Sequence, residues 1–224
     1  MTVSQLTANE LYVGADLAGP SPVGAAIAGI SVTCTGPDAQ GWFTCNADLE
    51  NGLTVTRQIR FWEGTAFGIS FSPTLTDSVN HQWSVAGTVN SIAKPGKVWT
   101  IADVDTATMN VLRGTGQPQH SWTGHAERHQ TSTYTVNSVE RIFDHQAHDT
   151  VTAVTFQMPR STNPYPISGS IIRNIVTNFT AGTFSKTVTR RYVVTFNGTN
   201  TATLTDGSLT CDLNLDLRTV SNCH

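Results

Sequence analysis

The chain has 224 residues, of which 38% are apolar and only 13% are charged, and its formal net charge is −3. This composition excludes a wholly disordered chain, a transmembrane bundle and a coiled coil, and the length allows one large domain or two modest ones. The weak negative charge, with only three lysines, also excludes the basic surface that binds nucleic acid or anionic membranes.

The first 29 residues are predicted to form a mobile arm. Residues 15–29 include Gly-Pro-Ser-Pro at 19–22 and lack the periodicity of a helix or a strand. No Lys or Arg occurs in the first 56 residues, which carry five acidic groups, so the remainder of the chain has a net charge of −3 − (−5) = +2. One hypothesis is that this arm adds a strand to the open edge of a neighbouring subunit, and the alternative is a disordered remnant.

From residue 30 onward, short β-branched and aromatic runs alternate with turn residues. Period-2 alternation predicts an all-β fold, an antiparallel meander or sandwich, as a single domain over 30–224. Two β domains divided near 114–119 are the alternative, and Thr76–Val89 leaves room for one short helix. The strands are expected at 30–35, 41–49, 53–62, 67–72, 82–89, 98–104, 107–113, 120–136, 139–147, 150–158, 167–179, 183–196, 200–206 and 208–217.

The four cysteines fall into two close pairs, which we predict to form the disulfides Cys34–Cys45 and Cys211–Cys223. In the chain-entropy model each bond stabilises the fold by about 3 kcal/mol. Paired cysteines, few lysines and 35 threonines favour an extracytoplasmic protein, whether secreted, periplasmic or on the cell surface. The first 30 residues lack the basic region of a signal peptide and contain no membrane span, so we expect that a leader was removed.

Histidines cluster between residues 120 and 148, where five of the seven occur. If Asn137-Ser138 forms a two-residue turn, then Glu127 lies opposite His148 on the neighbouring strand, and His125 and His129 share the same face. Three imidazoles and one carboxylate suit zinc or another first-row divalent ion, and a bound water would make the cluster hydrolytic. The alternative is an ordinary polar strand face, and a bulge at Gly124 would break the register.

All five tryptophans lie in the first 122 residues, and Trp62 and Trp99 are candidates for stacking on a sugar. The alternative is that these side chains are core anchors.

The C-terminal third permits a check of register against hydrophobic pattern. A two-residue turn at Asp206-Gly207 pairs Ala202 with Cys211, and a three-residue loop at 197–199 pairs Val194 with Ala202. Both turns place the same residues on one apolar face. That face comprises Tyr192, Val194, Ala202, Leu204, Leu209, Cys211, Leu213, Leu215 and Leu217.

Sequence motifs for known catalytic classes are absent: there is no nucleophile elbow, phosphate-binding loop, dinucleotide fingerprint or H-E-x-x-H. We therefore expect a non-catalytic protein that acts by binding or assembly, with a protein or glycan partner or through self-association by the arm. The alternatives are a metal-binding protein or metal-dependent hydrolase that uses the histidine cluster, and a carbohydrate-binding module.

Overall fold

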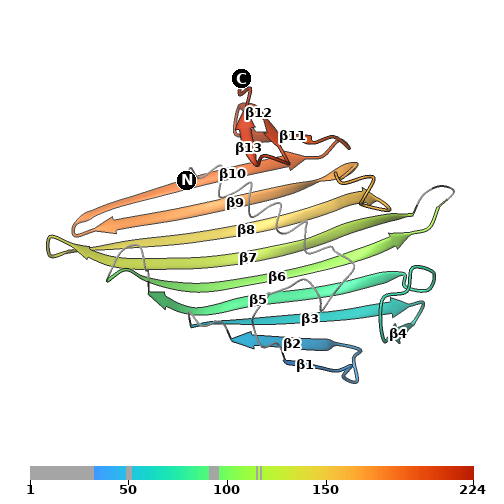
Figure 1. The fold of residues 1–224 in the computed structure, drawn as a ribbon. Coiled ribbons are helices and arrows are strands. Elements are labelled where there is room, and N and C mark those ends of the chain that lie inside the picture. Colours follow the sequence, from blue (N-terminus) through green and yellow to red (C-terminus); the bar gives the residue numbers. More distant parts are fainter. Residues whose placement is uncertain (1–32, 49–51, 91–95, 115, 117) are drawn as a thin grey trace.

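The computed structural model describes residues 33–48, 52–90, 96–114, 116 and 118–224 (Figure 1). Within these residues the chain forms thirteen strands and no helix, and every pair of strands is antiparallel, which confirms the all-β prediction. The predicted arm, residues 1–29, lies outside the described residues. The strands are β1 (Thr33–Thr35), β2 (Phe43–Asp48), β3 (Leu53–Glu63), β4 (Ala66–Gly68), β5 (Ser78–Asn90), β6 (Val98–Leu112), β7 (Gln119–Val136), β8 (Val139–Gln157), β9 (Ser168–Ala181), β10 (Phe184–Thr195), β11 (Thr201–Asp206), β12 (Leu209–Asn214) and β13 (Thr219–Ser221).

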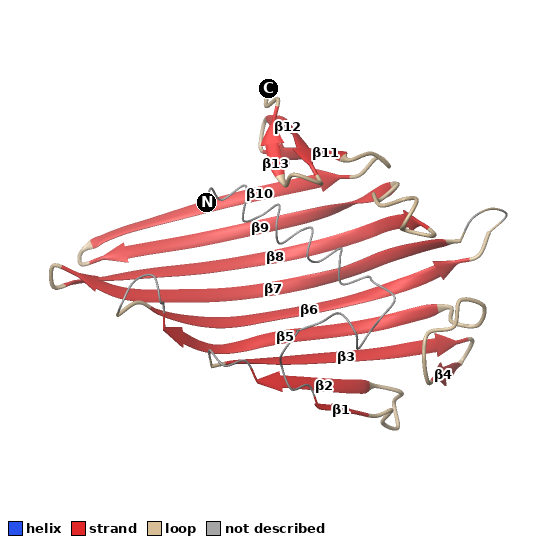
Figure 2. Cartoon of the chain, viewed as in Figure 1, coloured by secondary structure: helices blue, strands red, loops and turns tan. Residues whose placement is uncertain are grey.

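All the strands belong to one sheet, and they follow one another across it in chain order. The exception is β4, which pairs only with the end of β3. The long strands from β3 to β10 lie side by side, and β11–β13 stand at one end of β10 (Figures 1 and 2). A meander of this kind needs only short connections between neighbours, which is why the turn residues of the sequence locate the strands well.

The two faces of the sheet differ in what they bury, because successive side chains of a strand point to opposite faces. We call the face that carries Val79, Met109, Ala147 and Ile175 the core face, since these side chains are buried. The opposite face, which we call the open face, carries the alternate residues of the same strands. It includes many of the exposed or half-buried Thr, Asn, Gln and His side chains.

Two hydrophobic clusters stabilise the core face. The larger cluster joins β8–β12 and contains Phe156, Ile171, Val194 and Leu213. The smaller cluster joins β3, β5 and β6, and Trp122 packs against both clusters. The core face therefore carries two apolar clusters, which meet at Trp122 on β7.

A β-bulge in β8 accounts for the one irregularity of pairing in the long strands. The residues Thr152–Thr155 contain one more residue than the facing segments of β7 and β9, and Ala153 takes a φ of 46°. Gly169 of β9 lies against this bulge, and a Cβ at Gly169 would lie 2.4 Å from the carbonyl oxygen of Ala153. Only glycine fits at that crossing.

Both predicted disulfides form, one toward each edge of the sheet. Cys34 lies directly opposite Cys45 on β1 and β2. Cys211 of β12 is bonded to Cys223, and two backbone hydrogen bonds of 3.0 Å between Thr210 and His224 accompany that bond. The strands at the two edges are thus held covalently as well as by their ladders.

Several local predictions were wrong. The segment proposed as a short helix, Thr76–Val89, is mostly strand β5. The predicted strands 98–104 and 107–113 are one strand, as are 139–147 and 150–158, and most of 67–72 is loop.

The C-terminal register was also wrong, by two residues at each turn. Val194 pairs with Leu204 and not with Ala202, and Leu204 pairs with Cys211. A shift of two preserves the face of each side chain, so the predicted apolar face is largely correct. Leu209 and Leu217 are the exceptions, and both are exposed.

Candidate binding face

The hairpin of β7 and β8 has the register predicted for the histidine cluster. Asn137 and Ser138 both take positive φ, as a two-residue hairpin turn requires, and Glu127 lies opposite His148. The bulge in β8 begins beyond the partner of Gly124, so it leaves this register intact. His125, Glu127, His129 and His148 all lie on the open face, where they are exposed.

Their side chains nevertheless do not converge on one point. His125 hydrogen-bonds to Thr106, with 3.0 Å between Nε2 and Oγ1, and His129 bonds to Asp144 at 2.7 Å. The His148 Nδ1 lies 3.8 Å from Glu127 Oε1. Among the described residues, no group of three or more His, Cys, Asp or Glu is placed to hold a metal ion. Residues i and i+2 on one face of a strand are about 6.8 Å apart. Each of these side chains therefore pairs with a nearer residue on an adjacent strand.

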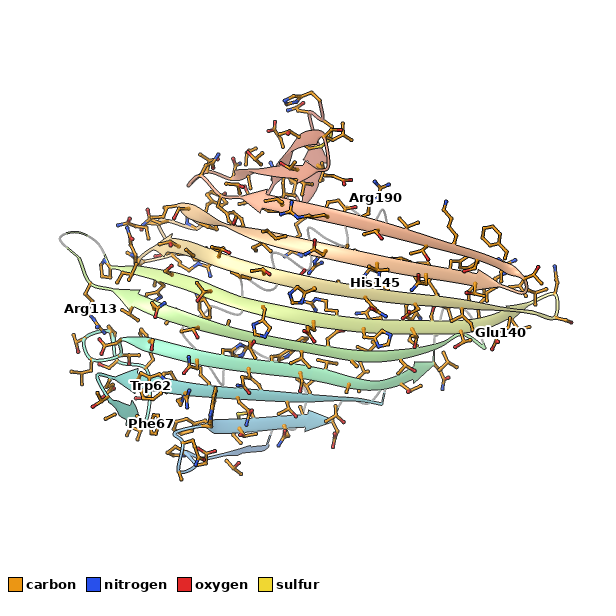
Figure 3. All side chains as sticks on the ribbon, turned by 180° about the vertical axis from the view of Figure 1, so that it is seen from behind. Trp62, Phe67, Arg113, Glu140, His145 and Arg190 are labelled. Atoms are coloured by element: carbon orange, nitrogen blue, oxygen red, sulfur yellow. A yellow bond between two sulfur atoms is a disulfide. The ribbon has the colours of Figure 1, made fainter. Side chains whose placement is uncertain are left out.

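Trp62 and Trp99 lie on opposite faces and near opposite ends of the sheet. Trp62 follows the buried Phe61 and faces the open side, whereas Trp99 pairs with the buried Ser132 on the core face. Trp62 pairs with Ser78 and Trp99 pairs with Val89, and these two residues of β5 are roughly 36 Å apart along the strand. Figure 3 shows Trp62 beside Phe67, at the end of the strands away from Glu140. The two tryptophans therefore cannot bind the same ligand.

The open face is hollowed between Trp42 and His125 by a groove of about 340 Å³. The groove crosses β3, β5, β6 and β7, three steps between neighbouring strands, which together span about 14 Å. None of its lining residues is acidic. They are Trp42, Arg60, Asn80, His81, Gln82, Thr106, Ala107, Thr108, Thr123, Gly124 and His125.

Asn80 is held in one orientation in this groove. Its side-chain oxygen accepts hydrogen bonds from Trp62 Nε1 at 2.6 Å and from both Nε and an η-nitrogen of Arg60, at 3.2 and 2.8 Å. Its amide nitrogen donates to Thr108 Oγ1 at 2.9 Å. The polar groups of the floor are thus fixed before any ligand arrives, which reduces the entropic cost of binding.

An aromatic cluster surrounds Arg60 at the Trp42 end of the groove. The Arg60 guanidinium lies 4.4 Å from the centroid of Trp42, 4.8 Å from that of Trp62 and 5.6 Å from that of Phe67. The rings of Trp62 and Phe67 are themselves 4.6 Å apart. The loop before β2 is fixed by Asp38, whose carboxylate accepts the Trp42 backbone N–H at 2.8 Å. Cation–π contacts of this kind orient a half-buried tryptophan at the rim.

A second, larger groove of about 480 Å³ adjoins the first on β6 and β7. It contains three of the four predicted metal ligands, Glu127, His129 and His148, together with more apolar surface. Its other lining residues are Ala102, Val104, Arg128, Gln146, Ala147, Asn174 and Val176.

His81 is the titratable side chain most changed by its surroundings. It is buried on the core face, and Arg57 Nε donates a hydrogen bond of 3.0 Å to its Nε2. Burial, and then the charge of Arg57, lower the pKa of His81 to about 4. The imidazole is therefore neutral at pH 7 and acts there as an acceptor for Arg57.

Comparison with known proteins finds no matching protein family, no similar curated protein and no similar solved structure. Within the described residues, the structure contains no helix that is long and apolar enough to cross a membrane.

Three residues of the groove, Trp42, Arg60 and Asn80, were not among the predicted site residues. The signal was present in the alternation, because Arg60 and Trp62 share a face of one strand and Asn80 and Gln82 share a face of another. Joining these pairs requires the register between β3 and β5, and fourteen residues that include β4 separate those two strands. No short turn fixes that register in advance.

Proposed function

We propose that this protein is a non-catalytic binding protein that holds a saccharide in the groove between Trp42 and His125. The proposal is based on the groove lining, where the half-buried Trp42 lies beside the amide of Asn80 and the guanidinium of Arg60. Threonine hydroxyls of β6 and β7 line the same groove on the open face. This proposal keeps the expectation of a binding protein and makes the saccharide its ligand.

The chemistry of the groove suits a ligand rich in hydroxyl groups. A side-chain amide donates and accepts hydrogen bonds, a guanidinium donates them in pairs, and a threonine hydroxyl both donates and accepts. An aromatic ring offers a flat apolar surface to the C–H face of a sugar, and it loses little entropy because it is held in place. The absence of carboxylates among the lining residues makes a strongly cationic ligand a poor fit.

An extracytoplasmic location is part of the proposal. Two disulfides close loops near the two edges of the sheet, and disulfides persist in oxidising compartments. Few lysines and many threonines agree with this location. Saccharides of cell surfaces and matrices would then be the available ligands.

The test is a glycan array on the intact protein, followed by calorimetric titration with the best ligand. We expect Trp42→Ala to weaken binding about tenfold, which corresponds to roughly 1.4 kcal/mol for a lost aromatic contact. Asn80→Ala is expected to weaken it further, because this change also releases Arg60.

The matched controls are Trp99→Ala on the core face and Asn174→Ala in the second groove, and both should bind normally. An array with no saccharide bound would refute the proposal. Equal losses in the groove variants and the controls would place the ligand elsewhere.

A further inference from the structure

Part of strand β10 is an open edge of the sheet. Its whole length, Phe184–Thr195, pairs with β9, but β11 pairs only with Tyr192–Thr195. Within the part of the chain that the structure describes, no strand pairs with the other side of residues 184–191. Figure 1 shows β10 continuing well beyond the short strands β11–β13.

This edge has the properties of a template for one more strand. It is eight residues long, all eight residues are exposed, and it contains neither proline nor a bulge. Thr187, Val188 and Thr189 are β-branched, and the apolar side chains of Phe184 and Val188 are 57% and 36% exposed. Long, regular, exposed edges of this kind accept extended peptides through backbone hydrogen bonds.

The charges of the edge select the strand that can pair with it. Lys186, Arg190 and Arg191 lie within the open segment. If a second copy of β10 paired with it antiparallel about Val188, Lys186 of each copy would face Arg190 of the other. Like charges directly opposite one another are destabilising, so the edge disfavours its own copy and favours an acidic strand.

We propose that this edge is occupied by the N-terminal segment of the same chain, within residues 1–32. That segment contains no Lys, Arg or His, and it carries the acidic residues Glu10 and Asp16. Between them lies Leu11-Tyr12-Val13, a run that favours a strand. The two carboxylates are opposite in charge to Lys186, Arg190 and Arg191, of which Arg190 also lies 3.8 Å from Asp206.

The segment is long enough to reach β10 of its own molecule. Thr33 begins β1, and eight steps between neighbouring strands separate β1 from β10, so a strand on the outer side of β10 lies nine steps away, about 43 Å. The sixteen Cα–Cα steps from Leu17 to Thr33 span up to about 55 Å when the chain is extended. Attachment to the same chain also gives the segment an effective concentration in the millimolar range, which favours pairing within one molecule.

Hydrogen exchange measured by mass spectrometry on the full chain tests this pairing. In the wild type we expect protection of the alternate amides of residues 184–191 that point away from β9, in addition to those that already bond to β9. The double variant Glu10→Lys/Asp16→Lys should speed their exchange at least about tenfold. Adding Lys186→Glu and Arg190→Glu to that variant should restore protection, because the charges are then exchanged. Glu140→Lys, an exposed acidic residue on β8, is the control and should change nothing.

Val13→Pro is a second variant that does not depend on charge, because it removes a backbone donor from the proposed strand. Fast exchange in the wild type at the amides of 184–191 that point away from β9 overturns the proposal, as does protection of these amides that neither N-terminal variant changes. Light scattering, which measures the oligomeric state, distinguishes pairing within one chain from pairing between two copies. Protection that appears only in dimers or larger species would assign the edge to another copy and refute pairing within one chain.

Discussion

The core face and the open face carry charged groups on the same strands but differ in how far they bury them. On the core face, Arg173 is 1% exposed and donates a hydrogen bond of 2.6 Å to Asp149. On the open face, the side chains of His129 and Glu127 are 54% and 75% exposed. The same strand geometry therefore yields structural charges on one side and accessible groups on the other.

The buried charges of the core face alternate in sign across four neighbouring strands. Asp103, Arg128, Asp149 and Arg173 lie on β6, β7, β8 and β9 in that order. Arg128 is 3.6 Å from both carboxylates. Gln130 donates a further hydrogen bond of 3.1 Å to Asp103. A slip of one strand by two residues would keep the apolar pattern but would separate these pairs, so the row specifies register where hydrophobicity alone does not.

The largest effect is expected from removing one member of this row. Arg173→Met leaves Asp149 buried with only the more distant Arg128 as a cation, and we expect it to lower the free energy of unfolding by about 3 kcal/mol. Glu140→Gln, an exposed change on β8, the strand of Asp149, should lower it by less than about 0.5 kcal/mol. Urea unfolding followed by circular dichroism measures both.

The double variant Arg173→Met/Asp149→Leu sharpens this result. Since it removes both charges together, it should be more stable than Arg173→Met alone. If the double variant is no more stable than the single one, the loss comes from packing and not from an unpaired charge.

An intermediate effect is expected from pH, through His81 on the core face. Its pKa in the folded state, about 4, is below the ordinary value of 6.5, so the unfolded chain binds the proton more strongly. The stability from the neutral imidazole is complete above pH 6.5 and is lost as the pH falls toward 4. The total loss is about 3 kcal/mol.

His81→Gln removes the titrating group and keeps an acceptor for Arg57, so its unfolding free energy should fall less between pH 7 and pH 4.5 than that of the wild type. Identical profiles for the wild type and His81→Gln would show that His81 is not the group responsible.

The contrast between the faces also explains which predictions from sequence succeeded. Alternation reports the face of a side chain directly, so Val194, Leu204 and Cys211 were correctly assigned to the core although their partners were wrong by two residues. The exact partner depends on where a turn begins: one loop is Gly207-Ser208 and not Asp206-Gly207. Such shifts leave the hydrophobic pattern unchanged, and the sequence alone does not distinguish them.

The candidate site required more than alternation. The two-residue turn at Asn137–Ser138 fixed the register of His148 with Glu127, and the structure confirms it. Convergence of the four side chains failed because Thr106 and Asp144 lie nearer to His125 and His129 than the other predicted ligands do. These competing partners follow from neighbouring positions on β6 and β8 that the metal hypothesis left out of account.

The smallest effect is expected from the open-face pair of His129 and Asp144. The 2.7 Å hydrogen bond between them is exposed to water, so breaking it exchanges one polar contact for another with solvent. His129→Ala should therefore lower the free energy of unfolding by less than about 1 kcal/mol. Urea unfolding at pH 7 measures it beside Arg173→Met. A loss as large as that of Arg173→Met would mean that the open face also carries structural charge, and the functional distinction between the two faces would fail.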